Sequence, residues 1–179
     1  MSAALALPTL STARLILEPL TLAHSAGMFA TFSREEVTRY SGPAADLNGA
    51  PIRLPAETPE DSDRIIVFFL KGAADGERFR WAVRTRDDGA FVGAIGFNHL
   101  GACPEIAYHL HPDAWGRGLM AEAAETALDW LRERPDAQEV AAYIERQNVA
   151  SVRLAERLGM RPTGETSGPA HRYQMPLSR

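Results

Sequence analysis

The sequence predicts an α/β fold in a single domain over residues 1–179, with helices on both faces of a sheet. Three observations lead to this prediction. Strand-type and helix-type segments are interleaved along the chain, without a linker, repeat or low-complexity tract. The 179 residues, 45% of them hydrophobic, suffice for one sizeable core. A strand also leads through a glycine-containing turn into a long helix.

The first third of the chain is expected to form one strand, three helices and a long loop. Residues 14–18 have strand composition, and residues 21–32 and 33–39 are typical of two short helices that begin at a threonine and a serine. The segment from Ser41 to Pro59 lacks periodicity and is predicted to be a substrate-side loop. A third helix begins with a capping residue, a proline and two acids, and is expected to end at Gly72.

Strands dominate the middle of the predicted chain. Residues 79–85 alternate in polarity, an Asp-Asp-Gly hairpin turn follows, and residues 90–98 form the returning strand. Residues 105–110 form a further strand that ends before Pro112. Residues 119–131 carry apolar residues at helical spacing.

The last part of the chain continues the alternation. Residues 139–144 are predicted to be a strand, and residues 148–158 a helix that ends at a glycine. Residues 160–165 and 171–175 are expected to close the fold as a hairpin.

Composition disfavours several classes of protein. A formal net charge of −4 argues against a broad nucleic-acid interface, and no apolar run approaches the roughly 18 residues that span a bilayer. Cys103 is the only cysteine, so neither an intrachain disulfide nor a cysteine-based zinc cluster can form, and we expect a cytoplasmic protein without a metal. Cys103 as an acyl-carrying nucleophile is the less favoured alternative to an incidental loop cysteine.

The most informative turn lies between residues 110 and 119. Gly116 and Gly118 allow the backbone to curl so that successive N–H groups point into one concavity at a helix N-terminus, and Arg117 adds a cation. Such a turn can hold a pyrophosphate. The sequence also satisfies the dinucleotide fingerprint G-x-G-x-x-A, but the glycines do not follow the strand directly, and Glu145 lies farther on than the usual acid.

Four segments occur in a fixed order, at residues 12–20 (TARLILEPL), 91–96 (FVGAIG), 105–118 (EIAYHLHPDAWGRG) and 148–160 (beginning NVAS and ending RLGM). Together they resemble the GNAT superfamily of N-acetyltransferases, specifically its RimJ/RimL-like branch. Two positions depart from that pattern. Met120 stands where the loop usually has a small residue, so its side chain is expected to crowd the pyrophosphate, and Glu18 stands where the branch often has arginine.

The resemblance implies a mixed, mostly antiparallel central sheet of about seven strands. It implies transfer of an acetyl group from acetyl-CoA to a primary amine, belonging to a protein N-terminus or a small molecule, by direct attack on the thioester. A non-catalytic acyl-CoA-binding or sensing domain is the alternative, and only turnover separates the two. We expect a monomer or homodimer with neither a nucleic-acid nor a membrane partner.

Amine acetylation needs a base for the amine and a hydrogen-bond donor for the thioester oxygen. Glu105, at the start of the strand that leads to the turn, is the candidate base, and His109 or His111 on the same face of that strand is the alternative. Ser151 resembles a serine that protonates the departing thiolate. The tyrosine that serves as acid elsewhere in the superfamily is replaced by Ala155.

Asn148 can cap its helix, and the resemblance adds a contact with the pantetheine arm of the cosubstrate. The resemblance also implies that the backbone amides around His109 and Leu110 face the pantetheine and the thioester. The implied cosubstrate contacts are His109, Leu110, His111, Trp115, Gly116, Arg117, Gly118, Leu119, Met120 and Asn148.

Overall fold

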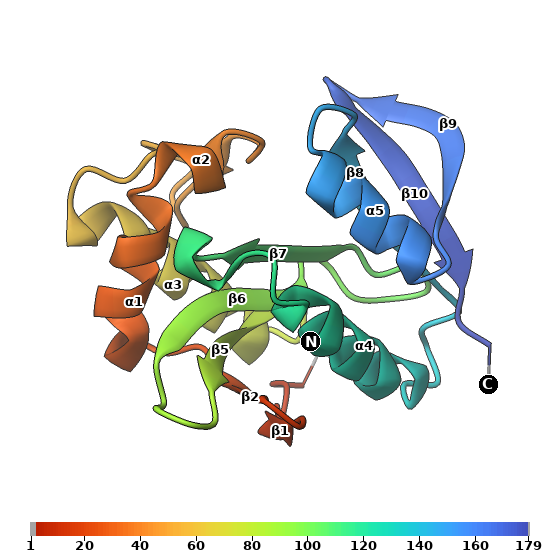
Figure 1. Cartoon of the computed structure of the whole chain (residues 1–179), viewed down its shortest axis with the longest axis horizontal. Helices are drawn as coiled ribbons and strands as arrows, with labels where there is room; N and C mark the ends of the chain where they lie inside the picture. Colours follow the sequence, from red (N-terminus) through yellow and green to blue (C-terminus); the bar gives the residue numbers. More distant parts are fainter. Residues whose placement is uncertain (1–2, 179) are drawn as a thin grey trace.

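The structure is a computed structural model that describes residues 3–178. Figure 1 shows the arrangement of its strands and helices. In chain order the strands and α-helices are β1 (Leu10–Ser11), β2 (Leu15–Pro19), α1 (Ser25–Phe32), α2 (Glu35–Thr38), β3 (Ala44–Ala45), β4 (Pro51–Ile52), α3 (Pro59–Ala74), β5 (Phe79–Thr85), β6 (Phe91–Phe97), β7 (Ile106–Leu110), α4 (Leu119–Arg132), β8 (Glu139–Glu145), α5 (Val149–Arg157), β9 (Arg161–Ser167) and β10 (Ala170–Pro176). Two short 3-10 helices, Leu22–His24 and Pro112–Ala114, precede α1 and α4 respectively.

Eight of the ten strands form two antiparallel sheets that meet at one point, and β3 and β4 form a separate two-stranded sheet. The larger sheet has the order β1-β2-β5-β6-β7, and the smaller has the order β8-β10-β9. A single parallel bridge, Glu105 to Ala141, joins β7 to β8, where the Ala141 N–H donates to the Pro104 carbonyl at 2.9 Å. Beyond the bridge β7 and β8 diverge, and no ladder continues between them within residues 3–178. The mostly antiparallel α/β prediction is confirmed, but the sheet is split into five and three strands.

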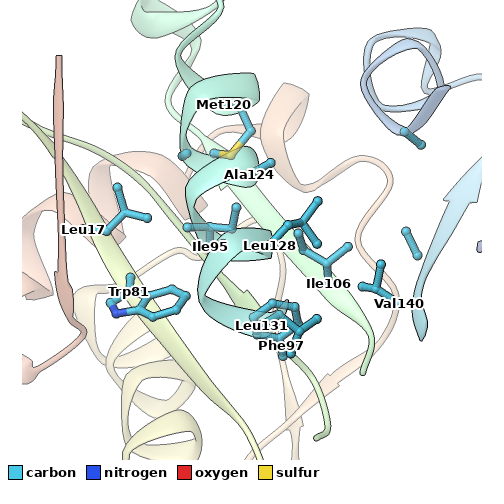
Figure 2. Packing of buried hydrophobic residues seen from close by; sticks show 14 of the residues in the cluster. Leu17, Trp81, Ile95, Phe97, Ile106, Met120, Ala124, Leu128, Leu131 and Val140 are labelled. Carbon is cyan, nitrogen blue, oxygen red and sulfur yellow. The ribbon is translucent and has the colours of Figure 1, made fainter. Parts of the chain in front are cut away.

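Both faces of the larger sheet are covered by helices. On one face α4 packs its apolar side on the strands, and Figure 2 shows Met120, Leu128 and Leu131 of α4 among the buried side chains of this cluster, which include Leu17 and Trp81. On the other face α1 and α3 bury a second cluster around Ala82 and Ala94. Burial of apolar side chains at about 25 cal/mol per Å² is the main force that holds helices of this kind to a sheet.

Local sequence accounts for the start of α3 but not for its predicted end. Thr58 and Asp61 form a reciprocal capping box, with proline in the first turn as predicted. Gly72 does not end the helix, which continues to Ala74. A Cβ at Gly72 would lie 2.2 Å from the Arg78 Cγ, so this glycine allows Arg78, just before β5, to pack closely against α3.

Other differences occur where elements are short. Arg34, not the predicted serine, precedes α2, and the helix expected over residues 21–32 is a 3-10 turn followed by α1. The predicted loop from Ser41 to Pro59 contains the strand pair β3–β4, and a 2.6 Å ion pair between Asp46 and Arg64 ties it to α3. Within residues 3–178, no helix is both long enough and apolar enough to cross a membrane.

Candidate active site

The outer edge of β7 is left open where β8 diverges from it. At the two ends of the β6–β7 ladder, the backbone carbonyl of Glu105 accepts from the Asn98 N–H (2.8 Å) and the backbone N–H of His111 donates to the Val92 carbonyl (2.7 Å). Every second residue of this strand therefore pairs with β6. The backbone groups of Tyr108 and Leu110 therefore point away from β6, and their two N–H groups have no protein acceptor among the described residues. These two residues are called the open edge of β7.

This geometry decides which of the expected backbone amides is available. The His109 N–H faces β6, where His109 is paired with Ala94, so it is not free for a ligand. The Leu110 N–H faces outward as expected, and Tyr108 takes the place assigned to His109. The Leu110 carbonyl accepts from the Trp115 Nε1 at 2.8 Å, which fixes the indole beside the strand end.

The glycine turn after β7 is exposed and has the backbone conformation that an anion site requires. Gly116 and Gly118 have φ of 73° and 72°, in the left-handed region, and Gly118 is the N-cap of α4 without any side-chain cap. The first N–H groups of α4 are therefore open to a ligand at the positive end of the helix. A Cβ at Gly116 would meet nothing within 4 Å.

The side chains of the turn divide into two groups. Leu119 and Met120 are 1% and 7% exposed, and both belong to the core cluster below α4, so only their backbones face the turn. The expected crowding by the Met120 side chain is therefore absent, because that side chain points into the core (Figure 2). His111 is used as a cap, its Nδ1 accepting from the Asp113 N–H at 3.2 Å, whereas Trp115 is 48% exposed.

Glu105 lies just before β7, where the bridge to Ala141 joins the two sheets. Its Oε1 accepts from the Asn98 Nδ2 at 2.8 Å, and its Oε2 is 3.8 Å from the His99 Nδ1. The Arg80 Nη2 donates to the Asn98 Oδ1, the oxygen of the same side-chain amide. Burial lowers the pKa of Arg80 to about 9, while the charge of Glu105 works in the opposite direction. The carboxylate is thus oriented by its neighbours but keeps 22% of its surface exposed, so water can reach it.

His109 lies on the same face of β7 as Glu105. Its Nε2 is 2.9 Å from the Ser41 Oγ, and its ring packs 4.6 Å from that of Phe32. Burial, assisted by the charge of Arg80, lowers the pKa of His109 to about 4. The imidazole is therefore neutral at pH 7, and its Nε2 is engaged by the Ser41 hydroxyl.

Tyr108 and Ser151 meet on the opposite face of β7. Asn148 caps α5 by accepting from the Ser151 N–H at 3.4 Å, which places Ser151 in the first turn of the helix. Burial raises the pKa of Tyr108, and a hydrogen bond with Ser151 works against this. The phenol therefore stays protonated at neutral pH and can donate a proton. Sequence reasoning overlooked Tyr108, although strand alternation puts it on the face away from Glu105 and His109.

The structure thus places the candidate residues in three groups around β7. Glu105 and His109 lie on the α1 and α3 face, Tyr108 and Ser151 lie on the other, and the glycine turn lies at the end of the strand. The Tyr40 Oη also donates to the Gln147 carbonyl at 3.3 Å, which connects the segment after α2 to the loop before α5. Among residues 3–178, no cluster of histidine, cysteine or acidic side chains could hold a metal ion.

Known proteins resemble this chain in sequence and in fold. A relative in Bacillus subtilis (strain 168), described as the uncharacterized N-acetyltransferase YoaA, is 29% identical over 160 residues, which cover 88% of this chain and 85% of that protein. An acetyltransferase from Agrobacterium tumefaciens str. C58 superposes with a TM-score of 0.74 at 24% identity, covering 98% of both chains.

A second solved structure is described as RimL, the ribosomal L7/L12 α-N-protein acetyltransferase, in complex with coenzyme A. It has a TM-score of 0.76 at 14% identity and covers 94% of this chain and 98% of that chain. The family model described as the acetyltransferase (GNAT) domain matches residues 14–161, and this chain therefore belongs to the GNAT acetyltransferase family.

Proposed function

We propose that this acetyltransferase transfers the acetyl group of acetyl-CoA to a primary amine. The observation that carries the proposal is the continuity of the open edge of β7 with the glycine turn. An extended amide-containing arm can pair with the backbone of Tyr108 and Leu110 as a further strand would. The anionic end of the same molecule then reaches the first N–H groups of α4. A RimL structure of the same fold is described as a coenzyme A complex, which supports this assignment.

The reaction needs a route for two protons. The amine attacks the thioester carbon and passes its proton, through a water molecule, to Glu105, which afterwards releases it to solvent. An outward N–H of β7 donates to the carbonyl oxygen as negative charge develops there. When the carbon–sulfur bond breaks, the thiolate takes a proton from the Tyr108–Ser151 pair, which regains it from solvent. Because Glu105 and this pair lie on opposite faces of β7, the two transfers do not compete.

The acceptor is proposed to be a protein N-terminal α-amine, as in the RimJ/RimL-like branch, or a small-molecule amine. A hollow of about 420 Å³ between α2 and the segment 41–55 is lined by residues that include Glu35, Ser41 and Ile52. Since Ser41 also contacts His109, this hollow lies next to the α1-side face of β7. We propose that residues 41–59 shape the choice of amine, within a single GNAT-type domain that covers the chain.

Acetyl-CoA-dependent release of free thiol, measured over a panel of amines and N-terminal peptides, tests the proposal. Turnover that requires both acetyl-CoA and one class of amine is the expected result. Calorimetric binding of CoA without turnover of any amine or peptide would favour an acyl-CoA-binding or sensing domain. Failure of the protein to bind CoA at all would exclude both functions.

A further inference from the structure

The segment just before β2 is hydrogen-bonded to the first turn of α4, although about one hundred residues separate them in sequence. Thr12 donates its hydroxyl to Oε1 of Glu122, and the Arg14 N–H donates to the same oxygen at 2.9 Å. The Arg14 Nε donates to Oε2 of Glu122 at 2.7 Å. The Arg14 Nη1 donates to the carbonyl of Arg117, inside the glycine turn, at 2.8 Å.

The position of Glu122 creates an electrostatic difficulty for an anionic ligand. A carboxylate in the first turn suits the dipole of its own helix, but it repels a pyrophosphate bound at the same helix end. Burial raises the pKa of Glu122, but hydrogen bonds from Thr12 and Arg14 outweigh burial and hold the pKa below its usual value. The carboxylate is therefore charged at neutral pH, and Arg14 is the cation that lies against it.

Arg14 also has donor capacity left over. Its Nε and Nη1 are used on Glu122 and on the Arg117 carbonyl, whereas its Nη2 has no acceptor among residues 3–178. That Nη2 lies 3.7 Å from the point where a Cβ on Gly118 would be. The free edge of a planar guanidinium is thus fixed beside the left-handed glycine that caps α4.

We propose that Arg14 is a positioning residue for the anionic end of the cosubstrate. It holds the Arg117 carbonyl so that the turn keeps its open conformation, and it cancels the charge of Glu122 that would otherwise repel the ligand. This inference rests on the proposed function, because it takes the ligand of the turn to be the pyrophosphate of CoA. Arg14 thus contributes to binding from outside the turn, more than one hundred positions away in sequence.

Calorimetric titration with CoA tests the role of Arg14. Arg14→Gln removes the positive charge and the planar guanidinium that donates to two acceptors at once. CoA should then bind at least about tenfold more weakly, the effect of losing one charge-assisted contact. Arg86→Gln is the matched control. The Arg86 Nη1 donates to the Thr12 carbonyl at 2.8 Å, so this residue holds the same segment, and within residues 3–178 its side chain makes no hydrogen bond or ion pair with α4 or the turn. The control should bind CoA within about twofold of the unaltered protein.

A second substitution separates charge cancellation from simple support of the loop. The double variant Arg14→Gln with Glu122→Gln lacks the unpaired carboxylate, so it should recover part of the lost CoA affinity. If the segment were only a structural support, the double variant would bind no better than Arg14→Gln. Arg14→Lys keeps the charge but cannot reach two acceptors in fork geometry, so its affinity should lie between those of Arg14→Gln and the unaltered protein.

The outcomes distinguish this inference from the proposed function. If the unaltered protein does not bind CoA, both are overturned. If it binds CoA but Arg14→Gln binds equally well, or Arg86→Gln loses as much affinity, only the role of Arg14 is overturned. A thermal melt accompanies each titration. Should Arg14→Gln not fold, Arg14→Lys decides, because affinity equal to that of the unaltered protein would remove the fork from the explanation.

Discussion

Two side chains on one face of β7 could accept the proton of the amine, and their surroundings differ. Glu105 is hydrogen-bonded to Asn98 through one carboxylate oxygen and keeps part of its surface in contact with water. His109 is enclosed between Phe32 and Ser41, and burial lowers its pKa to about 4. The Nε2 of His109 lies 2.9 Å from the Ser41 Oγ, whereas the Glu105 carboxylate can receive the proton through a water molecule. We therefore assign the proton to Glu105.

Glu105→Gln should lower kcat by roughly 10²–10⁴-fold, the usual contribution of general acid–base catalysis. The amide preserves the shape of the side chain, so CoA affinity measured by calorimetry should stay the same. His109→Gln serves as the matched control, with a much smaller loss in kcat. The reverse order of the two effects would assign the base to the histidine.

Tyr108→Phe and Ser151→Ala should slow the reaction moderately, because each removes one hydroxyl of the pair that protonates the thiolate. A thiol with a pKa near 8.5 leaves tolerably without help, so each loss should stay below that of Glu105→Gln. The informative measurement compares thioesters whose thiols differ in acidity. If the pair is the acid, a more acidic leaving thiol should rescue both variants. Equal losses with every thioester would argue for a packing role.

At the scale of elements, the end of β7 and the start of α4 form the unit on which binding depends. The strand presents two outward N–H groups, the turn curls through two left-handed glycines, and the helix begins without a side-chain cap. Each part is ordinary by itself, and their direct succession makes one continuous surface for an extended, anionic ligand. Changes in this unit should alter binding, whereas changes on the buried side of α4 should alter stability.

Gly118→Asp should abolish most CoA binding, since it places a negative charge where the phosphates are proposed to lie. Gly118→Asn is the matched control for backbone strain, because asparagine has a similar size and tolerates the left-handed region comparatively well. The asparagine variant should bind CoA more tightly than the aspartate variant. Equal affinities in a calorimetric titration would show that charge at this position is unimportant.

Met120 lies on the buried side of α4, and the substitution Met120→Ala tests that side. The side chain is 7% exposed within the core cluster, so truncation should reduce the free energy of unfolding by about 2–5 kcal/mol. Its backbone amide is retained, and CoA affinity should change little. Urea denaturation followed by a CoA titration of the folded variant measures the two effects separately. A large loss of affinity with little change in stability would place the side chain on the ligand.

At the scale of the whole molecule, the sequence predicts what is locally determined. The glycine turn, the apolar side of α4 and the capped start of α3 depend on residues close together in the chain, and the structure contains all three. The split between β7 and β8 depends on which strands pair over long distances, which a periodic pattern does not encode. The same reason applies to the contacts of Arg14 with Glu122 and of Ser41 with His109, which join segments far apart in sequence.

The split sheet has a consequence for the protein when no ligand is bound. Unpaired strand edges can recruit strands from other molecules, and the outward N–H groups of Tyr108 and Leu110 form such an edge. A molecule that pairs with this edge would act as a missing strand between the two sheets, and would stabilise the native state by mass action. Amide hydrogen exchange at these two residues should then slow on ligand binding, and the protein should resist self-association best in the presence of its cosubstrate.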